Sequence, residues 1–368
     1  MRIAIDAREL SGKPTGVGRY LKELLAAWAE LPGATAHEFV LCTPSTDLPV
    51  FPGLTTTVAS RPGHGTFWEQ WTLPDLVRRA RADVLFAPAY TGPLLGSVPL
   101  VLTVHDVSFS AHPEWFGWRE GLRRRTLARL AARRAIKVLT ISDFSKQEIV
   151  RHLGVRHEKI EVIYPGTTIH PGVGSKRARR ATDAVTVLYV GSIFNRRHVP
   201  ELIQGFARAA ADQPLMRLEI VGDNRSRPHV PLEALVHAAG LGDRVRIRSY
   251  VSDTELARLY ETASAFAFLS DYEGFGLTPL DALAMDIPIV VLDTPVSREV
   301  YGPAAEFVAR PEPALIAEAL TRVLFDRQAR ARLQEAGRVM VSRYSWRECA
   351  QRTLQILTAS AHAGSRPS

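Results

Sequence analysis

Residues 185–206 read VTVLYVGSIFNRRHVPELIQGF and contain one complete strand, loop and helix pattern. A short run rich in β-branched residues leads to Gly191, and a helical pattern of apolar residues begins near Val199. An apolar run this short, ended by a glycine, is typical of a strand in a parallel sheet. The stretch therefore predicts a βα unit whose loop after Gly191 lies at the carboxyl end of a strand.

Similar units fill the rest of the chain. Further strands are expected within RIAID (2–6), EFVLCT (38–43), ADVLFAP (82–88), PLVLTVHD (99–106), KVLTIS (137–142), KIEVIYPG (159–166), RLEIVGD (217–223), RVRIRSYV (244–251), SAFAFLS (264–270) and IPIVVLD (287–293). Helical patterns separate these runs, so the fold class is α/β with parallel sheets.

A segment rich in glycine, proline and basic residues interrupts this alternation and divides the chain. We expect a Rossmann-like domain over 1–170, a linker over 171–184 and a second Rossmann-like domain over 185–345, the two facing a central cleft. The remainder, 346–368, is expected to form a helix with a tail that frays from His362.

Composition limits the possible partners. The 368 residues are 46% hydrophobic and 23% charged, which suits two domains with a core each. The net charge of +8 favours nucleic acid, phosphorylated ligands or an anionic membrane surface. Cys42 and Cys349 lack a metal-like spacing, and a reducing, cytoplasmic setting fits them. The start MRIAIDAREL predicts a strand rather than a signal peptide, and any membrane contact is expected to be peripheral.

The loop after Gly191 carries two neighbouring arginines, Arg196 and Arg197, just before a predicted helix. Guanidinium groups bind a diphosphate through bidentate, charge-assisted hydrogen bonds. These two side chains therefore predict a diphosphate clamp at the junction between strand and helix.

A second anion site is expected within SDYEGFGLTPLDALAMDIPIV (270–290). Pro279 suits the first turn of a helix, so the amides of residues 275–278 should lie at its positive end. Glu273 would then lie beside the group esterified to a bound phosphate, and Asp281 could accept hydrogen bonds from a ribose diol. No Asp-x-Asp pair follows a predicted strand, so we expect a site without metal.

The first half offers two weaker signals. Gly16, Val17 and Gly18 precede a helix, where glycine allows close approach of a ligand, but the third glycine of a dinucleotide fingerprint is absent. His105 and Asp106 follow a predicted strand, where the imidazole can donate to a sugar hydroxyl and the carboxylate can orient another. An ordinary turn and a locally satisfied histidine remain the alternatives.

Two further stretches have both a functional and a structural interpretation. Tyr250 and Val251 end a strand and precede a helix capped by Ser252, and their loop could contact a nucleotide base. Residues 113–137 carry exposed-looking aromatic residues among many arginines, which suits an anionic membrane surface. The alternative for this helix is a solvated arginine face over a buried stripe of leucines.

Five motifs together resemble one known family, the bacterial family 4 retaining glycosyltransferases, whose fold is the two-domain GT-B architecture. The motifs are TGVGRY (15–20), LTVHDVSF (102–109), ISDFSKQEIVRHLGV (141–155), VGSIFNRRH (190–198) and EGFGLTPLDALA (273–284). The resemblance covers nearly the whole chain and implies that the terminal helix returns to the first domain. It also implies transfer of a hexose from a nucleotide sugar to a glycan or lipid-linked glycan.

The resemblance gives each matching residue a role. It implies that Glu273 contacts the donor sugar, that His105 lies near that sugar, and that Arg196 and Arg197 hold the diphosphate. Asp281 stands where the family has a second glutamate on the ribose. The predicted donor-binding residues are Gly191, Tyr250, Val251, Gly274, Phe275, Gly276, Leu277, Thr278 and Asp281, and the predicted acceptor-side residues are Gly16, Val17, Gly18 and Asp106.

Several alternatives stay open. Openings like TGVGRY resemble mannosyltransferases that use GDP-mannose, but UDP-glucose and other UDP-sugars fit the same motifs, and no cofactor beyond the donor is expected. A sugar-nucleotide epimerase or a phosphorylase could share the architecture, although the second domain has no lysine at a strand end for pyridoxal. A nonenzymatic membrane-associated scaffold is the alternative from another class. A nucleic-acid partner is not expected, because no basic and aromatic recognition motif occurs.

Overall fold

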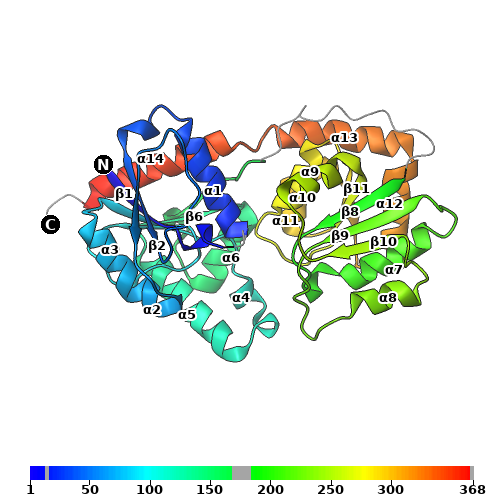
Figure 1. The fold of residues 1–368 in the computed structure, drawn as a ribbon, viewed down its shortest axis with the longest axis horizontal. Coiled ribbons are helices and arrows are strands. Elements are labelled where there is room, and N and C mark those ends of the chain that lie inside the picture. Colours follow the sequence, from blue (N-terminus) through cyan, green and yellow to red (C-terminus); the bar gives the residue numbers. More distant parts are fainter. Residues whose placement is uncertain (13–15, 168–183, 365–368) are drawn as a thin grey trace. The chain divides into compact units, whose positions relative to one another are not determined.

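The computed structural model describes residues 1–12, 16–167 and 184–364, and the chain divides into two compact units (Figure 1). Unit 1 comprises Met1–Gly166 and Tyr344–Ser368, and unit 2 comprises Thr167–Arg343. The predicted linker, 171–184, lies outside the described residues except for Ala184. No helix among the described residues is long and apolar enough to cross a membrane.

Unit 1 is built on a seven-stranded parallel sheet with the order β3-β2-β1-β4-β5-β6-β7. Its strands are β1 (Arg2–Asp6), β2 (Glu38–Thr43), β3 (Thr56–Ser60), β4 (Val84–Ala87), β5 (Leu100–Thr103), β6 (Lys137–Thr140) and β7 (Ile160–Val162). Its helices are α1 (Gly16–Ala29), α2 (Gly65–Phe67), α3 (Leu73–Arg79), α4 (Ser108–Ala111), α5 (Trp118–Arg134), α6 (Asp143–Leu153) and α14 (Trp346–Gly364).

Unit 2 is built on a six-stranded parallel sheet with the order β10-β9-β8-β11-β12-β13. Its strands are β8 (Val185–Val190), β9 (Met216–Val221), β10 (Val245–Arg248), β11 (Ala263–Phe268), β12 (Ile289–Leu292) and β13 (Ala305–Val308). Its helices are α7 (Val199–Ala209), α8 (Leu232–Ala238), α9 (Asp253–Thr262), α10 (Leu277–Ala284), α11 (Pro295–Tyr301), α12 (Pro313–Phe325) and α13 (Arg327–Val341).

Short helical turns complete the chain. They are η1 (Arg8–Leu10), η2 (Ala34–Ala36), η4 (Pro113–Trp115) and η5 (His157–Lys159) in unit 1, η6 (Asn195–Arg197) and η7 (Gly302–Ala304) in unit 2, and η3 (Trp68–Thr72), which is a π-helical turn of unit 1.

Both sheets have a topological switch point, where the strand order reverses direction. It lies between β1 and β4 in unit 1 and between β8 and β11 in unit 2. Ligands of open α/β sheets bind beyond the carboxyl ends of the strands at such a point. In unit 2 this places the loop between β8 and α7 beside the loop between β11 and α10.

Helix α14 closes unit 1 and lies along α1 (Figure 1). The indole Nε1 of Trp28 donates to the Ala350 carbonyl at 2.8 Å, and the Trp28 ring stacks on Phe39 with centroids 5.0 Å apart. Trp28 is fully buried, so this contact joins the terminal helix to the core of unit 1. The helix extends through Gly364, and the rest of the tail predicted to fray from His362 lies outside the described residues.

Helix α5 differs from its sequence interpretation. The alternative interpretation, a buried stripe of leucines, was wrong, since Leu122 and Leu130 are 52% and 42% exposed. The helix instead buries Gly121, Ala128, Ala131 and Ala132. These small residues allow α5 to lie close to the unit, and the longer apolar side chains are left on the surface.

Candidate functional site

The loop between β8 and α7 begins where two backbones come very close. A Cβ at Gly222 would lie 1.9 Å from the Gly191 carbonyl oxygen, and one at Gly191 would lie 2.9 Å from Nη1 of Arg197. Only glycine fits both positions without displacing backbone or guanidinium. The sequence thus lets the Arg197 side chain lie directly against the end of β8.

Arg197 is held by contacts on every side of its guanidinium group. Nε donates to Oε1 of Glu273 at 2.9 Å, Nη2 lies 2.8 Å from the same oxygen, and Nη1 donates to the Ser192 carbonyl at 2.8 Å. The cation also lies over the Phe268 ring, 4.9 Å from its centroid. Burial by itself lowers the pKa of Arg197, but the charges and hydrogen bonds of Glu273 and Tyr189 together outweigh burial, and the pKa is raised. The site therefore contains a fixed, permanent cation.

Arg196 points to a different neighbour. Its guanidinium stacks over the Phe194 ring, 4.4 Å from the centroid, while its carbonyl oxygen accepts from the amide of Asp271 at 2.9 Å. The structure thus brings Arg197 to Glu273 and places Arg196 over Phe194. Both arginines belong to the same short loop, at the switch point of the sheet.

Glu273 has one engaged and one open oxygen. Its Oε1 accepts from Arg197 and also from the Ser270 hydroxyl at 2.9 Å. No described residue donates to Oε2, and the Glu273 side chain is 20% exposed. An engaged oxygen fixes the orientation of the carboxylate, and the second oxygen is available to a ligand hydroxyl.

Helix α10 begins at Leu277 with no side-chain cap. Gly276 has φ of 94°, and a Cβ there would lie 2.0 Å from the Tyr301 hydroxyl oxygen. That hydroxyl lies 3.2 Å from the Phe275 carbonyl and 2.8 Å from the Gly276 carbonyl, to which it can donate. Tyr301 thereby fixes the turn that presents the first amides of α10, where an anion is favoured.

Asp281, the predicted ribose ligand, lies on α10 and is 2% exposed. Its Oδ1 accepts from the Thr167 hydroxyl at 3.2 Å. Its assignment to the ribose stays a prediction. Tyr250 and Val251 follow β10, where Tyr250 is exposed and Val251 is buried, and Ser252 caps α9 as the sequence predicts.

In unit 1, His105 follows β5 and is held from two sides. Its Nε2 lies 2.7 Å from the Pro88 carbonyl, and its ring meets the Tyr20 ring edge-on at 4.8 Å. A carbonyl only accepts, so Nε2 carries the hydrogen, while burial lowers the pKa of His105 and keeps the ring neutral. Nδ1 is then an acceptor, whereas the sequence interpretation had the imidazole donating.

The other residues that the sequence predicts on the acceptor side differ in their surroundings. Asp106 Oδ1 accepts from the Ser108 amide at 2.8 Å at the start of α4. Gly16 begins α1 with open space around its Cα, Val17 is partly buried and Gly18 is buried, while residues 13–15 lie outside the described residues. Within the described ranges, no three His, Cys, Asp or Glu side chains form a possible metal site.

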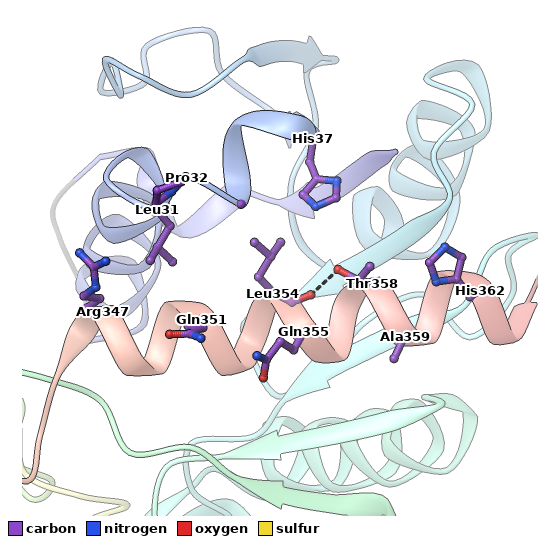
Figure 2. A pocket seen from close by; sticks show the side chains of 11 residues that line it. Leu31, Pro32, His37, Arg347, Gln351, Leu354, Gln355, Thr358, Ala359 and His362 are labelled. Atoms are coloured by element: carbon purple, nitrogen blue, oxygen red, sulfur yellow. Dashed lines mark hydrogen bonds between the residues drawn. The ribbon is translucent and has the colours of Figure 1, made fainter.

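A groove of about 680 Å³ in unit 1 lies elsewhere (Figure 2). It runs between α14 and the chain that follows α1, and its lining includes Leu31, His37, Leu354 and Thr358. None of the residues predicted from the sequence lines it. The chemistry-bearing residues instead gather at the carboxyl ends of the strands.

Sequence reasoning missed several residues of the unit 2 site. Ser270 and Tyr301 orient Glu273 and Gly276, yet Ser270 received no role within the quoted stretch 270–290, and Tyr301 lies outside every motif that the sequence analysis used. His198, directly after Arg197, was visible in the quoted stretch but received no role. Its contact with Asp271 joins residues 73 positions apart, which no local pattern indicates.

Comparisons with known proteins agree with this architecture. Residues 14–170 match the model of "Glycosyltransferase Family 4", and residues 175–340 match that of "Glycosyl transferases group 1". The chain is 29% identical over 274 residues to an MMP α-(1→4)-mannosyltransferase of Mycolicibacterium hassiacum, a match covering 70% of this chain and 64% of the relative. It is 28% identical over 233 residues to the O-antigen chain mannosyltransferase RfbU of Salmonella typhimurium, covering 63% and 62%.

Both matches therefore span less than two thirds of the relatives' own lengths. A crystal structure of Anabaena HepE in complex with UDP and glucose superposes with a TM-score of 0.75 at 19% identity, covering 98% of this chain and 100% of that one. The fold is thus GT-B, with two Rossmann-like units. The chain belongs to glycosyltransferase family 4.

Proposed function

We propose that the protein is a metal-independent, retaining glycosyltransferase, which moves a hexose from a nucleotide sugar to a glycan or lipid-linked glycan. The contact between Arg197 and Glu273, beside the uncapped start of α10, carries this proposal. It combines a buried cation, the start of a helix without a side-chain cap and a carboxylate with one open oxygen at a switch point. These groups match the charges and hydroxyls of a sugar diphosphate ester.

Catalysis follows from where charge develops. As the bond between the anomeric carbon and the phosphate oxygen breaks, negative charge grows on the leaving diphosphate. Arg196, Arg197 and the amides of Gly276 and Leu277 would stabilise that charge, which can contribute several kcal/mol. The acceptor hydroxyl attacks from the same face and the departing phosphate takes its proton. His105 would accept a hydrogen bond from a sugar hydroxyl through Nδ1.

We infer GDP-mannose as the donor, because both relatives compared above are named as mannosyltransferases. UDP-glucose or another UDP-sugar is the second candidate, since HepE was crystallised with UDP and glucose. No cofactor beyond the donor is assigned. Incubation with a panel of sugar nucleotides, followed by release of GDP or UDP, separates the two candidates.

The location we propose is the cytoplasm, with peripheral association at an anionic membrane surface. Both cysteines are buried free thiols, as a reducing compartment favours. Exposed apolar side chains lie on α5, at Trp118 and Leu122, and at or just after α2, at Phe67 and Trp71. The two helices meet where Arg123 donates to the Thr66 hydroxyl. Arginines 119, 123, 129 and 133 are exposed on α5. Aromatic residues beside cations suit an anionic lipid interface.

Vesicle sedimentation tests the membrane assignment. The protein should bind phosphatidylglycerol vesicles and should not bind phosphatidylcholine vesicles. Salt should weaken the binding. Trp118→Ser with Leu122→Ser should abolish it. Leu215→Ser in unit 2, which also replaces an exposed apolar residue, is the matched control and should bind normally. Equal binding by both variants would contradict the assignment.

Ligand-induced stabilisation tests the enzymatic proposal against the scaffold. GDP or UDP should raise the melting temperature, because a ligand bound to the native state stabilises it. Glu273→Gln should keep diphosphate binding and lose transfer. Sugar nucleotide turnover by Glu273→Gln at the normal rate would refute the role of Glu273. A protein that binds vesicles but neither diphosphate would be the scaffold.

A further inference from the structure

The residue after the two arginines has an unusual backbone. His198 has φ of 48° and ψ of 38°, in the left-handed region that favours glycine. It occupies the N-cap position of α7, where its side chain makes no capping hydrogen bond. Glycine adopts this conformation more readily than histidine, so a histidine at this position carries a cost in backbone strain.

Both nitrogens of the His198 ring face carboxylates. Nε2 lies 2.8 Å from Oδ2 of Asp271, and Nδ1 lies 3.7 Å from Oε2 of Glu201. Glu201 belongs to the first turn of α7, whereas Asp271 belongs to the loop between β11 and α10. An imidazole that faces an acceptor on each nitrogen is stabilised in its doubly protonated form. The ring therefore bridges two separate elements as a cation.

The bridge ends next to the residues of the candidate site. The amide of Asp271 donates to the Arg196 carbonyl, and Glu273, two residues later, receives the Arg197 guanidinium. The two loops are thus tied at three successive points. Of the three residues in the β8–α7 loop that make these contacts, His198 is the last along the chain and directly precedes α7.

We propose that His198 is a positioning residue that fixes the loop between β11 and α10 against the two arginines. In this arrangement the loop holds Glu273 and the first amides of α10 ready for a nucleoside diphosphate. The inference rests on the proposed function, because the diphosphate site is its object. His198 itself does not touch the ligand, and it acts through Asp271.

The charge of the ring makes this positioning depend on pH. The groups facing or adjoining His198 are Glu201 from α7, Asp271 from the other loop, and Arg196 and Arg197 before it in the chain. Burial alone lowers the pKa of His198, but its contacts with Asp271 and Glu201 outweigh burial and raise the pKa to about 9. The ring carries its full charge at neutral pH, and its attraction to the two carboxylates weakens as pH rises through about 9.

The variants His198→Gly, Asp271→Asn and their combination test this role. Glycine suits the left-handed backbone, so any loss in His198→Gly comes from the missing ring and not from strain. Arg81→Gly is the matched control, because Arg81 is an exposed residue of unit 1 with φ of 51°. Calorimetry with GDP and with UDP between pH 7 and 10, and amide hydrogen exchange over residues 270–277, are the measurements.

At pH 7, His198→Gly should bind the diphosphate about tenfold more weakly, the scale of a lost charge-assisted hydrogen bond. Asp271→Asn should weaken binding by a similar factor. The double variant should bind little more weakly than either single variant, because both substitutions break the same contact. Amides of residues 270–277 should exchange faster in each. Affinity of the unmodified protein should fall as pH rises through about 9, and His198→Gly should lack this fall. Arg81→Gly should match the unmodified protein.

Unchanged affinity and pH dependence in His198→Gly would overturn the inference. Faster exchange over residues 270–277 without weaker binding would also overturn it, because His198 would then hold the loop without serving the ligand. If the unmodified protein binds neither diphosphate, the proposed function fails, and this inference fails with it. These results are distinguishable because the exchange measurement needs no ligand.

Discussion

Replacing Arg197 by methionine should affect both stability and catalysis. Methionine keeps an apolar stem against Phe268 but removes the cation, and Glu273 then keeps only the Ser270 hydroxyl on Oε1. Removing one partner of a buried ion pair costs about 3–5 kcal/mol. Because the Arg197 and Glu273 side chains are 13% and 20% exposed, we expect the lower end, about 3 kcal/mol.

Hydrogen exchange at the buried amides of β8 measures this loss. About 3 kcal/mol should raise their exchange rates roughly 100-fold, since 1.36 kcal/mol corresponds to a factor of ten. Adding Glu273→Gln should restore most of the stability, because the isolated buried charge is gone. Donor turnover should fall about 100-fold or more in Arg197→Met and should not recover in the double variant.

Arg338→Met is the control for this experiment. Arg338 is an exposed arginine of α13 that pairs with Asp286 and Glu335, so it should leave turnover and β8 exchange unchanged. The reasoning is refuted if Arg197→Met retains normal exchange and normal turnover. It is also refuted if the double variant is less stable than the single one.

Three further predictions concern other contacts. Gly276→Ala should weaken the binding of GDP and UDP by tenfold or more, as measured by calorimetry. The φ of 94° at Gly276 and the nearby Tyr301 hydroxyl leave no room for a Cβ. Binding at full affinity would contradict this prediction. Trp28→Phe should destabilise unit 1 by about 1–2 kcal/mol by removing the donor to the Ala350 carbonyl, and unchanged exchange in α14 would count against it. Burial raises the pKa of the Cys42 and Cys349 thiols to about 12. Neither thiol should therefore react with a thiol reagent at pH 8 until urea unfolds the chain. Rapid labelling of the native protein would disprove this prediction. Since the unfolded thiols ionise first, stability should also decline as pH rises above about 9.

Local signals predicted much of the fold. The run 185–190 is a strand, α7 begins at Val199, and Ser252 caps α9, as residue patterns indicated. These features depend on neighbours within four residues of each other, so the sequence contains the whole cause. The two sheets followed from the repeated alternation for the same reason, and the comparisons confirm the predicted GT-B fold.

Other elements carried no sufficient local signal. The strand β3 has the sequence TTVAS, and its one large apolar residue, Val58, is 45% exposed at the sheet edge. The strand β13 is only four residues long. Helix α5 misled because its leucines resemble a core stripe, whereas alanines at positions 128, 131 and 132 make the actual contact. The short length of the strand β13 and the shape of the surface under α5 decided these structures, and a local sequence pattern specifies neither.

The site was predicted in its residue types but not in its contacts. Arg197 and Glu273 were assigned separately to diphosphate and sugar, and their direct ion pair was not foreseen. The pairing of β8 with β11 brings them together across 76 residues. The same pairing creates the contact of His198 with Asp271. Such contacts depend on strand order, which periodicity does not specify.

Product analysis with the donor panel tests the central claim most directly. The purified protein is incubated with GDP-mannose and UDP-glucose, and NMR follows diphosphate release and the anomer that first appears. The account predicts release of GDP from GDP-mannose, with the α-anomer formed first by the unmodified protein and a rate about 100-fold lower in Arg197→Met. It is contradicted if no sugar nucleotide is consumed, or if the β-anomer of mannose is formed first.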